Sequence, residues 1–155
     1  MGGPARASAG DGGSGLRDGE SLARLTVMDP ELVAALQPIL KDLAGPAGVL
    51  PEVRDEPWQD YERTASAILY EADGSGTGVF IHLGSPFSAQ VAALAEQVQD
   101  WAVEALCALE RSTSWPPCPE HPDRHPLAAV EQAGRAVWVC PVTGTEVGEV
   151  GTLTT

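Results

Sequence analysis

The sequence predicts an α+β fold in which a helix, a β-hairpin and a long helix precede a small C-terminal β-hairpin module. Three observations predict it. Apolar residues recur at spacings of three and four in two stretches, between residues 32 and 43 and between 87 and 109. Apolar residues also flank the glycine-rich segment "DGSGTG" in an alternating pattern. Near the C-terminus, "AVWVC", "PVTGT" and "EVGEVGTL" predict a strand, a turn and a second strand.

Composition favours one domain of ordinary size with an appended module. The chain has 155 residues, of which 43% are hydrophobic, enough for a core. Residues 1–24 hold seven of the 17 glycines and almost no large apolar side chains, so they are expected to form a disordered N-terminal tail. The α+β domain is expected over 25–112, and the appended module over 113–155.

The first helix is marked by its ends. Asp29 is a good N-cap, Pro30 suits the first helical position, and Gly45 suits the stop. Pro38 lacks an N–H, so it is expected to kink or divide this helix. Its apolar residues are Leu32, Val33, Leu36, Ile39, Leu40 and Leu43.

A proline-rich acidic connector follows, with Trp58 and Tyr61 expected to hold it against the domain. The hairpin comes next. Its strands are expected to place Ile68, Tyr70 and Ala72 opposite Val79, Ile81 and Leu83. No Lys follows the glycines of the turn, and a strand rather than a helix comes after them, which excludes a phosphate-binding loop. His82 is expected at the surface or half-buried.

The long helix is predicted to begin with Ser85 as its cap and Pro86 at its first position. Its apolar stripe consists of Phe87, Val91, Leu94, Val98, Trp101, Ala105 and Leu109. Its other face carries Glu96, Asp100 and Glu104, expected to be solvated. The 3–4 spacing also leaves a homodimer through the 86–110 helix open. Cys107 is expected to be a small core residue.

The chemistry lies in "WPPCPEHPDRHPL" and the later "VWVCPVTG". Together they hold Cys118, His121, His125 and Cys140 in the pattern C-x₂-H-x₃-H-x₁₄-C. Thiolate and imidazole are the natural ligands of zinc, which takes four of them in a structural site. These four residues are therefore the predicted metal ligands, with structural zinc as the cofactor. The alternative is a proline-rich loop and hairpin whose Cys and His side chains only pack.

"CPEHP" and "CPVTG" resemble the CPxCG knuckles of zinc ribbons. In this resemblance His121 replaces the second Cys of the first knuckle. Thr143 stands where the fourth ligand belongs, although Gly144 matches, and His125 is the substitute that we expect. The resemblance covers residues 115–151 and implies a zinc-ribbon-like module. The chain as a whole resembles small uncharacterised actinobacterial proteins that end in a Cys-Pro-x-His…Trp-x-Cys-Pro segment, and that resemblance implies no activity.

Charge limits the function classes. A net charge of −13 with no basic cluster weighs against nucleic acid, whose binding depends on Lys and Arg. No apolar run of membrane-spanning length and no signal peptide is found, so a cytoplasmic protein is expected. The leading interpretation is a zinc-stabilised interaction or adaptor protein with a protein partner and no catalysis of its own. The first alternative is a zinc-dependent hydrolase. In it Cys118, His121 and Cys140 bind the ion, water is the fourth ligand and Glu120 lies nearby. The second alternative is an acidic inhibitor or immunity-type protein for a basic partner.

Overall fold

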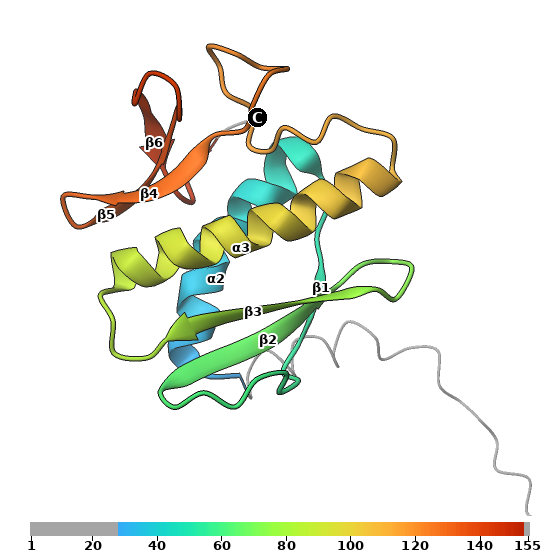
Figure 1. Ribbon diagram of the computed structural model, residues 1–155, viewed down its shortest axis with the longest axis vertical. Helices are drawn as coiled ribbons and strands as arrows, with labels where there is room; N and C mark the ends of the chain where they lie inside the picture. The colour runs from blue at the N-terminus through green and yellow to red at the C-terminus, as the bar shows by residue number, and fades with distance from the viewer. Residues whose placement is uncertain (1–27, 154–155) are drawn as a thin grey trace, which may run out of the picture.

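The computed structural model describes residues 28–153, which form two helices, a π-helical turn and two three-stranded antiparallel sheets (Figure 1). The predicted α+β class, with a helix, a hairpin, a long helix and then C-terminal strands, is confirmed. The predicted tail, 1–24, lies outside the described residues. Among the described helices, none has the length and apolar character needed to cross a membrane. In chain order the elements are α2 (Pro30–Asp42), η1 (Leu43–Ala47), β1 (Glu52–Arg54), β2 (Thr64–Tyr70), β3 (Gly76–His82), α3 (Phe87–Ala108), β4 (Ala128–Gln132), β5 (Arg135–Val139) and β6 (Glu146–Glu149).

The helix α3 is the centre of the fold. It runs between the sheet β1-β2-β3 and the sheet β4-β5-β6, and α2 crosses behind it in Figure 1. The middle of its apolar stripe is buried, including Leu94, Val98 and Trp101, and belongs to one hydrophobic cluster that also contains Trp138 of β5. Phe87 and Leu109, at the two ends of the predicted stripe, are exposed instead. The segments on either side of residue 112 therefore share one core. The predicted solvated face is confirmed, since Glu96, Asp100 and Glu104 are exposed.

Glutamine side chains of α3 cover the free edge of β3. Gln97 accepts a hydrogen bond from the Phe80 amide and donates one to the Phe80 carbonyl, both at 2.9 Å. Gln90 donates to the carbonyl of His82 at 2.9 Å. An edge strand whose backbone groups are bonded in this way has fewer groups left to pair with another chain.

A buried carboxylate connects the last residue of α2 to the C-terminal strands. Asp42 has no exposed surface, and its two oxygens accept three N–H bonds. The donors are the Trp138 indole at 2.8 Å, the Gly151 amide at 2.6 Å and the Leu153 amide at 3.0 Å. Because a buried carboxylate is costly unless it is hydrogen-bonded, these three bonds fix the C-terminal segment on α2.

The approach of that segment to α2 requires a glycine. Gly151 has φ +100°, and a Cβ there would lie 2.8 Å from Cβ of Pro38. Both the backbone conformation and the space exclude a larger residue. Pro38 itself does not divide the helix as expected, because α2 continues through it to Asp42.

The prediction of which hairpin side chains lie opposite one another is wrong. The register pairs Ala67 with Val79 and Ala65 with Ile81, and these residues are buried with Leu69, while Ile68 and Tyr70 face away from the helices. Small alanines allow the helices to pack close to the sheet. On the outer face, Trp58 donates to the Val79 carbonyl at 3.1 Å, so its predicted role in holding the connector is confirmed. Tyr61 is 70% exposed and has no such role.

Other local expectations also change. Pro86, not Ser85, occupies the N-cap position of α3, without a side-chain cap bond. The three-residue strand β1 lies within the predicted connector, and the alanine-containing β4 adds a third strand to the C-terminal sheet. Cys107 is exposed rather than in the core, because it lies near the end of α3 on its outer side. His82 is exposed, as expected.

We predict that Asp42→Asn lowers the free energy of unfolding by about 3 kcal/mol, since hydrogen bonds to a charged group are each worth roughly 1.5–3 kcal/mol. The amide would also present a donor to N–H groups that now have an acceptor. Urea unfolding followed by tryptophan fluorescence measures the change, with the exposed Asp60→Asn as the matched control. Equal stability of the two variants would contradict the role given to Asp42.

Candidate metal centre

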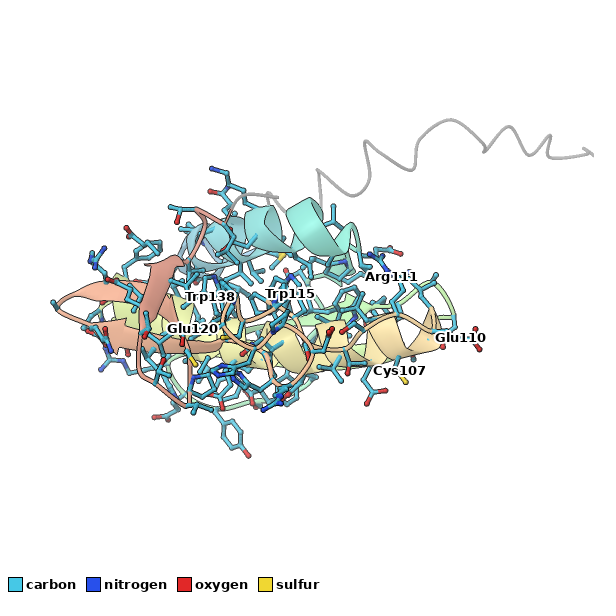
Figure 2. The ribbon with its side chains drawn as sticks, turned by 90° about the horizontal axis from the view of Figure 1, so that it is seen from above. Cys107, Glu110, Arg111, Trp115, Glu120 and Trp138 are labelled. Carbon is cyan, nitrogen blue, oxygen red and sulfur yellow. The ribbon has the colours of Figure 1, made fainter. Side chains whose placement is uncertain are left out.

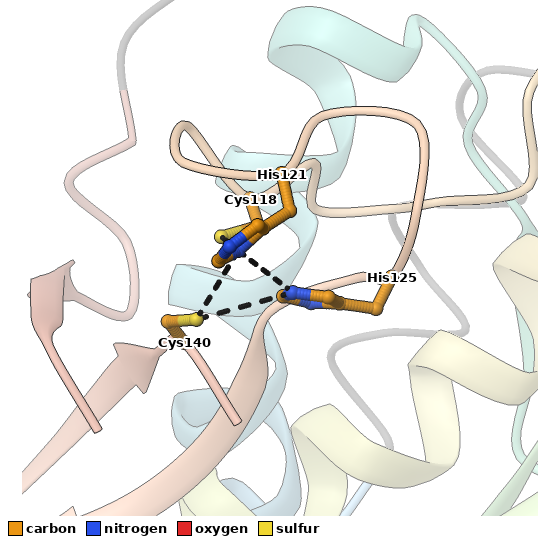
Figure 3. A group of neighbouring side chains, drawn as sticks. All are labelled: Cys118, His121, His125 and Cys140. Atoms are coloured by element: carbon orange, nitrogen blue, oxygen red, sulfur yellow. Dashed lines mark hydrogen bonds between the residues drawn. The ribbon is translucent and has the colours of Figure 1, made fainter. Parts of the chain in front are cut away.

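The four predicted ligands come together at one point, although they come from separate segments of the chain (Figure 3). Cys118 and His121 lie in the loop after α3, His125 lies further along it, and Cys140 follows β5. Their donor atoms all lie within 4.8 Å of one another, a grouping that could hold a metal ion. Both cysteine side chains are fully buried, and both histidines are half-buried.

The first knuckle is a tight turn. The His121 amide donates to the Cys118 carbonyl at 3.1 Å, which brings both side chains to the same side. Pro119 lies inside this turn, where its missing N–H leaves no bond unmade. The geometry agrees with the expectation that an x₂ spacing lets one turn present two ligands.

The ends of the ligand-bearing loop are held together at its base. The Leu127 amide donates to the Pro116 carbonyl at 2.8 Å. Gln99 of α3 donates to the carbonyls of both Leu127, at 2.7 Å, and Trp115, at 3.2 Å. One side chain of the central helix thus holds both ends of the loop that carries Cys118, His121 and His125.

The second knuckle surrounds the sulfur of Cys140. The Gly144 amide donates to the Cys140 carbonyl at 2.8 Å, and the Cys140 amide donates to the Thr145 carbonyl at 2.9 Å. The amides of Val142 and Thr143 and the Thr143 hydroxyl donate to the sulfur itself. Thr143 thus stabilises the Cys140 sulfur, and the fourth side chain of the Cys/His group is His125.

The donor spacing fits a tetrahedral ion. In a tetrahedron the donors are separated by 1.63 times the bond length, which gives about 3.3–3.8 Å for zinc bonds of roughly 2.0–2.3 Å. Nδ1 of His121 lies 3.7 Å from each of the two sulfurs. Nε2 of His125 lies 3.9 Å from the Cys140 sulfur and 3.0 Å from His121 Nδ1. Three of these four separations are within about 0.2 Å of the tetrahedral range, the two imidazole nitrogens are closer, and every donor pair lies within 4.8 Å.

Hydrogen bonding also selects the ring nitrogen that His125 presents. Its Nδ1 lies 3.0 Å from the Pro126 carbonyl, which can only accept, so Nδ1 carries the proton. In the neutral ring Nε2 is then the nitrogen that can bind a metal, and it lies 3.0 Å from Nδ1 of His121. Metal-bound histidines commonly donate their second ring N–H to a carbonyl in this way.

The surroundings of Cys140 favour the thiolate. They lower its pKa from 9.0 to about 6, and the largest cause is the hydrogen bond from the Thr143 hydroxyl. The amides of Thr143 and Val142 and the Cys118 side chain add to this lowering, whereas burial opposes it. Since a metal binds the thiolate, the site needs little proton release from Cys140 at neutral pH.

Sequence reasoning missed Asp42 and Gln99, which position the two halves of the site without being ligands. Asp42 supports Trp138, two residues before Cys140, and Gln99 holds the base of the loop. The sequence does contain a signal for Asp42. This residue lies three positions after Ile39, on the apolar face of the helix, where an unpaired carboxylate is rare. Glu120, the suggested general base, is exposed.

Comparison of the chain with protein-family models, with curated proteins and with solved structures gives no match. The nature of the centre therefore depends on its donor atoms and geometry. Those donors are two thiols and two imidazoles, held by α3 on one side and by the second sheet on the other.

We predict that Thr143→Val makes metal binding more sensitive to acid. A lowered pKa means that protons compete for Cys140 only as the pH falls through about 6, and loss of the hydroxyl moves this competition toward the ordinary value of 9.0. At neutral pH the metal affinity of the variant should fall as the pKa of Cys140 rises, by at most about tenfold for each pKa unit. At pH 9 and above the two proteins should bind nearly equally.

Chelator competition across this pH range measures the effect. Thr113→Val, which changes an exposed threonine outside the knuckles, is the matched control. The role of Thr143 would be contradicted by identical pH profiles for Thr143→Val and the unaltered protein.

Proposed function

We propose that this chain is a zinc-stabilised interaction protein of the cytoplasm, without catalysis of its own. The single observation that carries the proposal is the convergence of Cys118, His121, His125 and Cys140 within 4.8 Å. When bound, zinc supplies a cross-link between the loop after α3 and the end of β5. The residues around the site hold the donors in place for that cross-link.

Zinc is the ion that fits the donor set best. Two thiolates with two imidazoles in a tetrahedral arrangement are characteristic of structural zinc, whereas carboxylate, carbonyl and water ligands suit magnesium, calcium and manganese. No carboxylate belongs to the Cys/His group found among the described residues. The knuckle-like turns at Cys118 and Cys140 support the zinc-ribbon-like interpretation.

The donor count favours a structural ion over a catalytic one. A catalytic zinc keeps one position open for water or substrate, and a hydrolase at this site would use only Cys118, His121 and Cys140. Nε2 of His125 lies 3.0 Å from His121 Nδ1, close enough to complete the coordination. Four protein donors leave no position for a reacting water.

Surface properties support an interaction role. The net charge is −13, and several large apolar side chains are more than half exposed, among them Leu50, Phe87 and Leu109. The three cysteines are free, as expected where thiols stay reduced. A protein partner is therefore proposed, and nucleic acid is not, because the charge is of the wrong sign.

We predict one bound zinc per purified chain. Cys118→Ser and Cys140→Ser should abolish binding, and His125→Ala should weaken it strongly. Cys107→Ser and His82→Ala are matched controls, since both residues are exposed and outside the group. Metal analysis of the purified proteins gives the zinc content. Zinc-free protein from a zinc-replete preparation would overturn the metal assignment.

A second test separates a structural ion from a catalytic one. Glu120→Gln should leave zinc content and thermal stability unchanged, because Glu120 is exposed and is not among the four donors. Both proteins should be inactive on a panel of ester, amide and phosphoester substrates. A hydrolytic activity that requires zinc and is lost in Glu120→Gln would favour the hydrolase instead.

A further inference from the structure

A groove of about 420 Å³ lies between α3 and the candidate metal centre. One wall is the outer face of α3, with Glu96, Asp100 and Val103. The other wall consists of residues 125–129 and Pro141, so it includes the ligand His125 and the residue after the ligand Cys140. Figure 3 shows His125 extending from the loop on the side nearest α3. We call this feature the α3 groove.

The charged side chains that line the α3 groove are both carboxylates, and the side-chain amide of Gln99 is already bonded to the carbonyls of Leu127 and Trp115. Glu96 and Asp100 lie one helical turn apart and are both exposed, and no Lys or Arg lines the groove. Pro126 and Pro141 have no backbone N–H to offer. Two carboxylates without a neighbouring cation favour a ligand that carries cationic hydrogen-bond donors. The net charge of −13 adds to this attraction.

Most of the rest of the lining is apolar, apart from Gln99 and His125. Val103 is 37% exposed beside the carboxylates, and Leu127, Ala128 and Ala129 lie on the opposite wall. An ion alone would leave this surface uncovered. A ligand that fits both parts carries an arginine or lysine next to an apolar side chain, and the volume suits a short segment of chain rather than a folded domain.

We propose that the α3 groove is the docking site for a basic, apolar peptide segment of a partner protein. This inference rests on the proposed interaction function and gives it a surface and a partner chemistry. His125 connects the groove to the metal centre, because an ion that fixes His125 also fixes the wall formed by residues 125–129.

The experiment uses the zinc-loaded full chain and three labelled peptides of equal length. In the first peptide arginine alternates with leucine, in the second glutamate replaces arginine, and in the third glycine replaces leucine. Fluorescence anisotropy should show binding of the first peptide only, weakening with salt as ionic contacts are screened. Amide shifts in a ¹⁵N NMR titration should be concentrated in residues 96–103 and 125–129.

A charge-matched pair of variants tests the location. Glu96→Gln with Asp100→Asn should weaken binding by about tenfold or more, in keeping with loss of close charge pairs. Glu104→Gln with Glu62→Gln removes the same net charge from exposed positions outside the groove and should change affinity by less than about twofold.

The proposal is overturned if zinc-loaded, folded protein binds none of the peptides, if the glycine peptide binds as tightly as the leucine peptide, or if both double variants bind alike. Shifts at the groove that depend on protein concentration without peptide would identify a second copy of this chain as the occupant, also against the proposal. Zinc-free protein would instead mean that the proposed function itself fails.

Discussion

Two thiols and two imidazoles meet within 4.8 Å and bring the loop after α3 against the end of β5. Between the end of α3 at Ala108 and the start of β4 at Ala128 there is no helix or strand that could set the path by itself. Its turns are short, and several residues there are prolines without an N–H to bond. Under the proposed function, a metal ion that joins Cys118, His121 and His125 to Cys140 would supply the constraint that regular structure does not. This is why we regard the ion as part of the fold.

Polar contacts then fix that centre relative to the rest of the molecule. Gln99 holds the base of the loop to α3, and Asp42 holds Trp138 and the C-terminal segment to α2. Seen from above, Trp115 and Trp138 lie side by side over α3, and their rings meet edge to face at 5.7 Å (Figure 2). The two tryptophans thus join the first ligand segment and β5 within the shared core. The Asp42 carboxylate and the Gln99 amide thus hold different parts of a segment that has little regular structure.

Local features were predictable and distant ones were not. The Asp29 cap, the stripe of α3 and the short spacing of Cys118, His121 and His125 are each visible within a few residues, so the helices and most of the centre followed from the sequence. By contrast, Trp138 is 96 residues from Asp42, and no local pattern in either segment indicates that the two side chains are hydrogen-bonded. The facing of β2 was missed because its buried side consists mainly of alanines, whose small size reflects helices that pack closely on the sheet. The strand β4 was missed for a similar reason, since its alanines give no strong alternation.

The measurement that tests the central claim most directly is X-ray absorption at the zinc edge of the purified full chain. The account predicts four ligands, two sulfurs at about 2.3 Å and two nitrogens at about 2.0–2.1 Å, with imidazole scattering from both histidines. In His125→Ala one nitrogen should be lost or replaced by an oxygen. A spectrum of the unaltered protein with a bound oxygen in place of the second imidazole would contradict the account, because it would mean an open coordination position.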